Sequence, residues 1–208
     1  MQVLDNSSLL VSEQHIFIID DDQYMVKFLK NLLINMDYST YGFNNAIDFL
    51  KAIPDVSPSI LITDMKMAEM TGIELQAELV RLKRTMPVIF ISGESTVPQS
   101  IAALKQGAMD FLLKPVNKQQ LQTAVESAFV LEEQKNQSAI KKTTLEIKLN
   151  MLSPREREVY ELLILGYNNA QIVETLTISL STTKQYKTGV MRKLKLSSLS
   201  DLLDLQRL

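Results

Sequence analysis

The sequence feature that most limits the possible folds lies at residues 59–64. It is a short apolar run that ends in a single carboxylate. Four largely apolar, partly β-branched residues precede Asp64, and Thr71 and Gly72 then open a segment with helical spacing. This pattern predicts a buried parallel strand that carries Asp64 at its carboxyl end. Open α/β sheets place their chemistry at such strand ends. A lone Asp there is more often a solvated loop residue, so the case for Asp64 depends on its companions.

Four further apolar runs alternate with segments of helical spacing. The runs fall at residues 16–19, 38–41, 88–91 and 110–113. Among the helical segments, residues 97–106 end at Gly107, a residue type common just after a helix. Strands that alternate with helices predict right-handed βαβ units and a parallel sheet covered on both faces. With five strands, the leading topology is the flavodoxin-like order 2-1-3-4-5.

This strand order brings polar side chains from several strand ends into one crevice. The residues at the ends of strands one, three, four and five are Asp20, Asp21, Asp64, Ser92 and Lys114. Clustered carboxylates repel one another unless a hard cation lies among them, and Mg²⁺ suits such a site. A carboxylate can also accept a phosphoryl group, whose oxygens a hydroxyl and an ammonium can hold. Any one of these polar residues could stand at a strand end by chance. Five of them at matching strand ends are not explained in this way.

On these residues, positions 15–130 resemble the receiver domain of bacterial response regulators. The resemblance implies that Asp64 is the phosphorylated residue. It also implies that Ser92 and Lys114 are the family's hydroxyl and lysine, and that Phe111 is the aromatic switch that reports phosphorylation.

The same resemblance implies a magnesium site. Asp21, Asp64 and the backbone carbonyl of Lys66 would bind Mg²⁺ directly, and Asp20 would act through water. The chain departs from the family at Ala68, where a Pro is usual, and this change is expected to loosen a loop without touching the chemistry.

A second module opens with a strong helix start. Ser153 is a suitable N-cap, Pro154 suits the first helical position, and Glu156 completes a capping box. Two short helices joined by residues 177–179 follow, and the second, residues 180–194, has a polar and basic outer face. This is the helix-turn-helix layout, although a generic helical bundle fits the periodicity about as well. The residues expected to face inward are Leu180, Thr183, Val190 and Leu194.

Sequence motifs in this module are more specific than its layout. Leu-Ser-x-Arg-Glu-x-Glu-Val, Gly-x-x-Asn-x-x-Ile, Ile-Ser-x-x-Thr and Lys-Leu-x-Leu-x-Ser make residues 152–204 resemble a LuxR-type DNA-binding domain. The resemblance implies base-reading positions at Lys184, Gln185 and Thr188. Further DNA contacts are expected from Thr182, Lys187, Arg192, Lys195 and Ser197.

Three departures from the LuxR-type pattern lie on the expected recognition helix. Tyr186 replaces the usual His, and Thr183 replaces the usual Val. Gly189 lies in the helix interior, where Gly costs roughly 0.5–1 kcal/mol relative to Ala. We therefore expect modest DNA affinity from a single copy of the chain.

Between the modules, the chain contains neither Gly nor Pro from Val116 to Ser153. A flexible tether would usually contain such residues, so the last helix of the first module is expected to continue as a linker helix over residues 131–149. Thr143, Thr144 and Asn150 are weak helix formers and would allow a break within residues 136–144. The DNA-binding domain is assigned to residues 150–208.

Charge and composition narrow the function further. Residues 1–130 carry 10 basic and 15 acidic residues, whereas residues 150–208 carry 8 and 6, which suggests modules with different partners. The absence of Cys excludes disulfides, Cys-ligated metals and thiol nucleophiles, and the single histidine, His15, argues against a histidine-based triad. No signal peptide or membrane-spanning run is apparent, which favours the cytoplasm and no membrane partner.

Together the two resemblances describe a NarL/FixJ-type response regulator rather than an enzyme. We expect it to accept a phosphoryl group on Asp64 from a sensor histidine kinase, to form a homodimer when phosphorylated, and to bind double-stranded DNA, with RNA polymerase as a further partner. Two alternatives stay open. One is a regulator of the same family that acts without phosphorylation. The other is a haloacid-dehalogenase-like phosphatase with Asp20 and Asp22 as its Asp-x-Asp motif, although no acidic motif follows Lys114.

Overall fold

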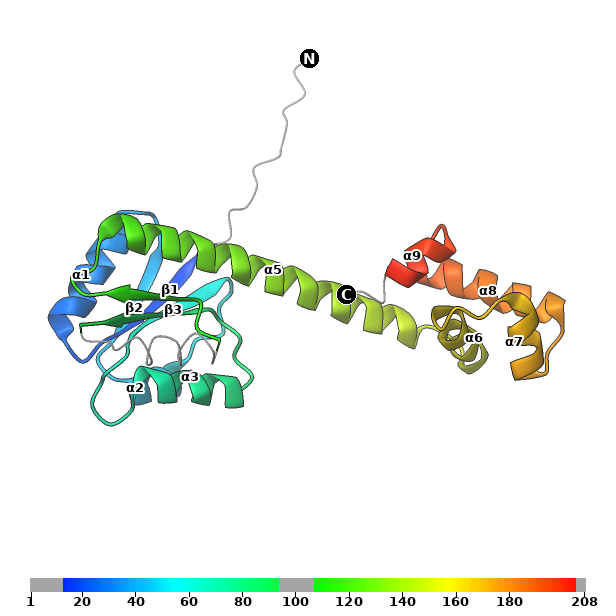
Figure 1. The fold of residues 1–208 in the computed structure, drawn as a ribbon, viewed down its shortest axis with the longest axis horizontal. Coiled ribbons are helices and arrows are strands. Elements are labelled where there is room, and N and C mark those ends of the chain that lie inside the picture. The colour runs from blue at the N-terminus through cyan, green and yellow to red at the C-terminus, as the bar shows by residue number, and fades with distance from the viewer. Residues whose placement is uncertain (1–12, 94–106, 205–208) are drawn as a thin grey trace, which may run out of the picture. The chain divides into compact units, whose positions relative to one another are not determined.

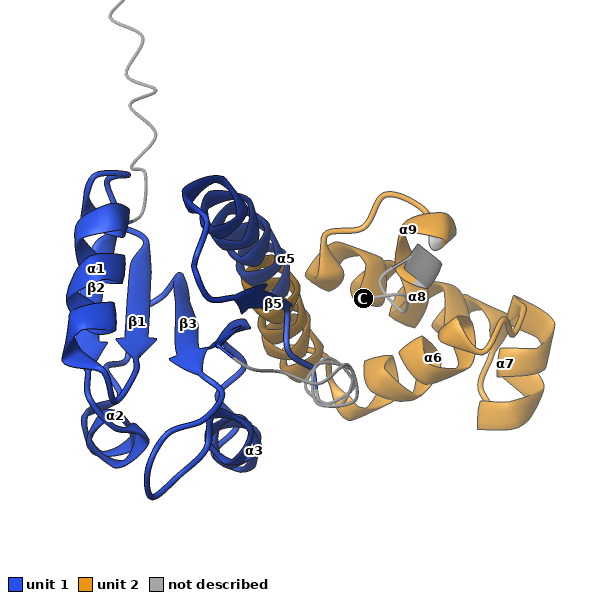
Figure 2. Ribbon diagram, turned by 60° about the vertical axis from the view of Figure 1, so that its left-hand side comes forward, with its two compact units in different colours: residues 1–135 blue, residues 136–208 orange. Residues whose placement is uncertain are grey.

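The computed structural model describes residues 13–93 and 107–204, and the chain divides into two compact units, residues 1–135 and 136–208 (Figure 2). The first unit contains the sheet. The described part of the second unit is helical, and each unit has a hydrophobic core of its own. The two units are therefore described separately.

Unit 1 is built on a five-stranded parallel sheet in the order β2-β1-β3-β4-β5, which confirms the predicted topology. The strands are β1 (His15–Ile19), β2 (Ser39–Phe43), β3 (Ser59–Asp64), β4 (Val88–Ser92) and β5 (Asp110–Leu113). Strand β2 begins one residue later than predicted and continues to Phe43. In this order β1 and β3 are neighbours, so their carboxyl ends open side by side.

Helices cover both faces of the sheet, as Figure 1 shows. One face carries α1 (Gln23–Ile34) and α5 (Lys118–Asn150), and the other carries α2 (Ala46–Ala52) and α3 (Gly72–Arg81). Successive strand residues point to opposite faces, so Ile16 and Ile18 enter one core while Phe17 and Ile19 enter the other. Both faces are buried, which explains why these strands are almost continuously apolar.

Side-chain caps fix where the helices of unit 1 begin. The carboxylate of Asp22 accepts the Tyr24 backbone N–H at 2.8 Å, and Asn117 accepts the N–H of Gln119 at 2.8 Å. Asp and Asn are among the preferred N-cap residues, because their side-chain oxygens accept the free N–H groups of the first turn. The helix predicted at residues 97–106 lies outside the described residues.

Helix α5 runs without interruption for 33 residues, from Lys118 to Asn150. The break that the sequence allowed within residues 136–144 does not occur. Its first part packs on the sheet through apolar side chains, and Phe129 stacks on Tyr38 with ring centroids 5.5 Å apart. The predicted linker is therefore the continuation of a helix that begins in unit 1.

Unit 2 contains α6 (Pro154–Ile164), α7 (Asn169–Leu176), α8 (Leu180–Leu194) and α9 (Leu199–Asp204). The capping box of Ser153 and Glu156 is present, and α8 has the predicted bounds. Leu180 is 50% exposed, so its predicted inward orientation is wrong. As the first residue of α8 it precedes Thr183, the first position of this helix that is buried.

Helix α9 was not predicted from the sequence. Its start is marked by Ser198, whose hydroxyl accepts the Asp201 backbone N–H at 3.1 Å, while the Asp201 carboxylate accepts the Ser198 backbone N–H at 2.9 Å. This reciprocal pair is a capping box with Asp in place of Glu. The Ser-x-x-Asp spacing is the sequence signal that could have revealed the helix.

Thr177 offers a test of the turn between α7 and α8. It ends α7 in the left-handed conformation (φ 53°, ψ 47°), which is unfavourable for a β-branched residue and suits Gly. We expect Thr177→Gly to stabilise unit 2 by about 1 kcal/mol, seen as slower hydrogen exchange at the α6–α8 amides of the full chain. The same change at Thr175, inside α7, should destabilise. Faster exchange in Thr177→Gly would contradict this account.

Candidate functional site

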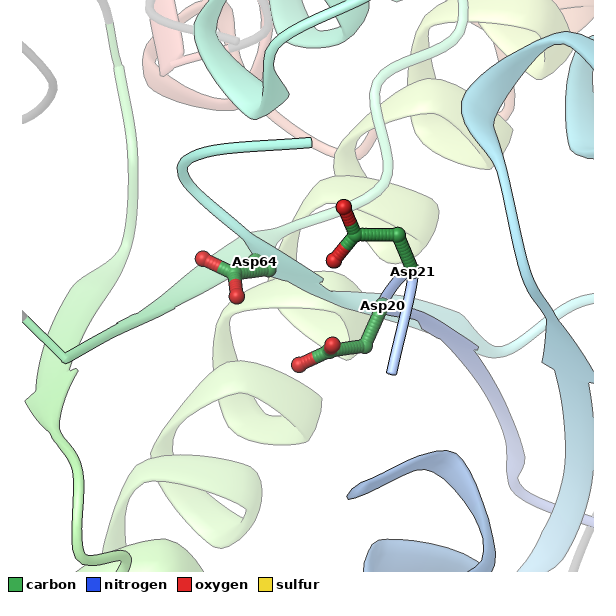
Figure 3. Close-up of side chains that lie close together, drawn as sticks. All are labelled: Asp20, Asp21 and Asp64. Atoms are coloured by element: carbon green, nitrogen blue, oxygen red, sulfur yellow. The ribbon is translucent and has the colours of Figure 1, made fainter. Parts of the chain in front are cut away.

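Three carboxylates converge at the carboxyl edge of the sheet. Asp20 and Asp21 follow β1, and Asp64 ends β3. Each of the three offers an oxygen that lies within 4.8 Å of the others (Figure 3). Asp20 is 1% exposed and Asp64 is 8% exposed, whereas Asp21 lies at the surface. The cluster is therefore acidic, and it is open to solvent on the side of Asp21.

Lys114 forms ion pairs with two of these carboxylates. Its Nζ donates to Asp64 Oδ2 at 2.6 Å and to Asp20 Oδ2 at 2.9 Å. Lys114 directly follows β5, and its backbone N–H donates to the Ser92 carbonyl at 2.8 Å, so pairing of β5 with β4 sets its position. The sheet thus brings Asp20, Asp64, Ser92 and Lys114 to one edge from four different strand ends.

Burial and charge act in opposite directions on these groups. Burial raises the pKa of Asp20 above its usual range, although hydrogen bonds from Lys114 and from the Asp22 backbone N–H oppose the rise. Burial alone would lower the pKa of Lys114, but its hydrogen bonds to Asp64 and Asp20 raise that pKa overall. Lys114 is therefore cationic at neutral pH. Because Asp20 is buried, keeping its carboxyl ionised makes the folded state less stable.

This cost can be measured with Asp20→Asn. A carboxyl whose pKa is raised by folding contributes stability below its ordinary pKa and loses that contribution as pH rises through the raised value. Without Mg²⁺, Asp20→Asn should therefore raise the unfolding temperature at pH 7, and the gain should disappear in acid, where Asp20 is protonated. Thermal unfolding against pH tests this, with Asp37→Asn as a surface control. An equal gain at all pH values would contradict it.

The donor set suits a small hard cation. Among the described residues, Lys114 pairs with Asp20 and Asp64 while Asp21 is exposed on the open side, so the cluster keeps an excess of negative charge. Oxygen donors of this kind fit Mg²⁺, which binds through a few carboxylates and keeps several waters. The Lys66 backbone N–H donates to Asp64 Oδ1 at 3.1 Å, which keeps the backbone of Lys66 beside the cluster.

Ser92 and Phe111 lie near this edge in different environments. Ser92 is 1% exposed at the end of β4, one residue after Ile91, the pairing partner of Asp64. Phe111 is partly buried in β5 and packs against the core on the α2–α3 side. Asp22, the second acid of the phosphatase alternative, instead caps α1 with its carboxylate.

The outer face of α8 forms a second candidate site, in unit 2. Lys184, Gln185, Thr188 and Arg192 are exposed and recur at helical spacing, whereas Thr183, Val190 and Leu194 are buried. Of the other residues expected to contact DNA, Lys195 and Ser197 are exposed and Thr182 and Lys187 are partly buried.

One contact of α8 was missed at the sequence level. Lys193 does not extend into solvent, because its Nζ donates to Glu156 Oε2 at 2.6 Å. From the sequence, Glu156 is predicted only as a capping residue. The pair joins α6 to α8 across 37 positions, and nothing in the local pattern of either helix indicates it.

A parallel five-stranded unit with an acidic cluster at its carboxyl edge, followed by a helical unit in which α8 has a polar outer face, is the arrangement expected of a response regulator with a helix-turn-helix output domain. Family comparison agrees: residues 16–126 match the response regulator receiver domain, and residues 150–206 match bacterial regulatory proteins of the luxR family. The chain belongs to the two-component response regulators of the NarL/FixJ type, which are transcription regulators.

Individual relatives span nearly the whole chain. It is 35% identical over 187 residues to the response regulator protein TodT of Pseudomonas putida, covering 90% of this chain and 82% of TodT. It is 34% identical over 196 residues to the transcriptional regulatory protein FixJ of Bradyrhizobium diazoefficiens, covering 94% of this chain and 96% of FixJ. The structure of the response regulator StyR matches with a TM-score of 0.79 at 33% identity, covering 94% of this chain and 99% of StyR.

In the described part of the chain, no helix is both long enough and apolar enough to cross a bilayer.

Proposed function

We propose that this protein is a phosphorylation-dependent transcription regulator that accepts a phosphoryl group on Asp64 from a sensor histidine kinase and binds double-stranded DNA through α8. The observation that carries the proposal is the environment of Asp64. Its carboxylate ends β3 beside two further carboxylates, with the Lys114 ammonium 2.6 Å from Oδ2. A carboxylate in this position can act as a nucleophile toward phosphorus, and the nearby ammonium can then bind the phosphoryl oxygens.

The reaction needs little more than placement. A carboxylate oxygen of Asp64 attacks the phosphorus of the donor, a P–O bond forms, and the bond from phosphorus to the donor imidazole breaks with its electron pair returning to that nitrogen. Lys114 then pairs with a phosphoryl oxygen, and the Ser92 hydroxyl donates to another. Asp20, Asp21, Asp64 and the Lys66 carbonyl would hold Mg²⁺. When bound, the ion offsets the negative charge of carboxylates and phosphoryl group.

The phosphoryl group is proposed to act by population shift. It competes for the ammonium of Lys114, which in the structure is divided between Asp64 and Asp20. A change at Lys114, Ser92 and Phe111 would favour one of two pre-existing arrangements of β4 and β5, and with it the homodimer. Dimerisation places two copies of α8 on paired half-sites of DNA.

DNA recognition is assigned to the outer face of α8. Lys184, Gln185 and Thr188 are exposed together there and are suited to base edges, and Arg192 is exposed nearby for phosphate. The excess of basic over acidic residues in positions 150–208 is small, 8 against 6, so phosphate neutralisation supplies little affinity to one copy. Dimerisation should therefore contribute more to DNA affinity than net charge does. RNA polymerase would be a further partner at the bound promoter.

The test uses the full chain and a duplex that it selects from a random-sequence library in the presence of Mg²⁺ and a small acyl phosphate. Fluorescence anisotropy should show tighter binding with the acyl phosphate than without it. Replacing both Lys184 and Gln185 by Ala should remove binding, whereas Lys51→Ala, an exposed change in unit 1, should not. If the α8 variant binds as tightly as the parent, DNA recognition is wrongly assigned. If acyl phosphate has no effect, the regulator acts without phosphorylation.

A further inference from the structure

Gly189 lies in the interior of α8 for a steric reason. A Cβ added at Gly189 would fall 3.3 Å from Glu156 Cδ and closer still to Glu156 Oε1, within the range that real Cβ atoms essentially never show. The Glu156 carboxylate thus lies directly against the α8 backbone. Gly is an unfavourable residue for a helix interior. Helix α8 is therefore intrinsically less stable at the point where α6 contacts it.

The Glu156 carboxylate cannot simply swing aside. Oε2 accepts the Ser153 backbone N–H at 2.7 Å at the start of α6, and it also accepts from Lys193 Nζ at 2.6 Å. The Glu156 side chain is 11% exposed and that of Lys193 is 31% exposed. Gly189 and Lys193 are four residues apart and share one side of α8, so Glu156 is enclosed between a bare backbone and an ammonium.

These contacts lie beside the proposed reading face. Gln185 is one helical turn before Gly189, and Lys193 is one turn after it. A shift of α8 away from Glu156 would therefore displace Gln185. Arg192, the neighbour of Lys193, is exposed and free to meet phosphate, whereas the ammonium of Lys193 is used within unit 2.

We propose that Glu156, Gly189 and Lys193 form a clamp that positions the recognition helix, with Glu156 as the positioning residue. The carboxylate fixes both the distance between α6 and α8 and the rotation of α8 about its axis. This inference rests on the proposed DNA binding by α8. It assigns a role in recognition to three residues that contact one another within unit 2, and it makes Gly189 a requirement of the clamp rather than a weak point of the helix.

The clamp predicts that the effect of Gly189→Ala on stability has opposite signs with and without the Glu156 carboxylate. In the full chain, Gly189→Ala should lower both the unfolding temperature of unit 2 and the affinity for the selected duplex, the latter about tenfold. In a Glu156→Ala background the added methyl group has space, and Ala favours the helix over Gly. There, Gly189→Ala should raise the unfolding temperature. Equal effects in both backgrounds would show that Glu156 does not occupy the Gly189 surface.

A second comparison separates positioning from stability. Glu156→Ala should weaken binding to the selected duplex at temperatures where unit 2 is fully folded. Glu156→Gln, which still accepts the Ser153 N–H but cannot form an ion pair, should recover part of that loss. Unchanged DNA affinity in every folded clamp variant would overturn the positioning role. If the parent chain selects no duplex at all, the proposed function has failed instead, and the positioning role falls with it.

Discussion

Asp64→Asn is expected to abolish both phosphoryl uptake and the rise in DNA affinity that an acyl phosphate produces. The amide has the shape of the carboxylate but lacks its nucleophilic oxygen. It also removes one of the two negative charges that pair with Lys114, and one of the three carboxylates that would hold Mg²⁺. Since Asp64 belongs to a crowded acidic cluster, the substitution should leave unit 1 folded and at least as stable as the parent. The loss is therefore one of chemistry and not of structure.

The measurement for Asp64→Asn combines intact mass with DNA anisotropy, each with and without acyl phosphate. Asp37→Asn is the matched control, because it is the same isosteric change at an exposed residue with φ 65°, a conformation that Asn tolerates well. The control should respond to acyl phosphate as the parent does. A normal response from Asp64→Asn would remove Asp64 from its proposed role.

Gly72→Ala should have the largest effect on stability. Gly72 is the first residue of α3, and its N–H donates to the Met65 carbonyl at 3.1 Å, which draws the helix onto the end of β3. A Cβ there would lie 2.9 Å from the Phe90 ring and closer still to the Asp64 carbonyl oxygen. Neither the strand backbone nor a buried ring can move easily. We expect a loss of about 2 kcal/mol in unit 1.

The same substitution should also disturb the proposed chemistry, because the atom that it presses on belongs to Asp64. Hydrogen exchange at the β3 and β4 amides measures the stability loss, and the rate of phosphoryl uptake measures the shift of the site. Gly93→Ala is the control: among the residues that the structure describes, its added Cβ would come no nearer than 3.9 Å to a neighbour, the Lys114 side chain. Similar stability losses in the two variants would show that crowding at Gly72 is not the cause.

Much of unit 1 follows from its sequence, for physical reasons. Strands buried on both faces must be apolar throughout, so the runs that end at Asp64 and Ser92 are easily recognised. The edge strand β2 is less apolar and more exposed, and its predicted bounds were less accurate. Once the strands are placed, the parallel order alone brings Asp20, Asp64 and Lys114 to one edge, because the carboxyl ends of parallel strands meet there.

Contacts between distant positions could not be predicted in the same way. The Lys114 hydrogen bonds to Asp20 and Asp64 set the charge balance of the crevice, and they depend on side-chain geometry that no spacing rule contains. Gly189 illustrates the same limit: by helix propensity it is only a poor residue, and its reason appears when Glu156 is seen against it. Local rules describe α8 as a helix, but the packing of α6 determines which residue α8 needs at that point.

The central claim is that Asp64 accepts the phosphoryl group, and mapping that group on the parent chain tests it most directly. The full chain is incubated with Mg²⁺ and a small acyl phosphate as donor, and its intact mass is recorded. The phosphorylated residue is then reduced with borohydride and located by peptide mass spectrometry. The account predicts a single phosphoryl group, located at Asp64. No uptake, or a phosphoryl group on any other residue, would contradict it.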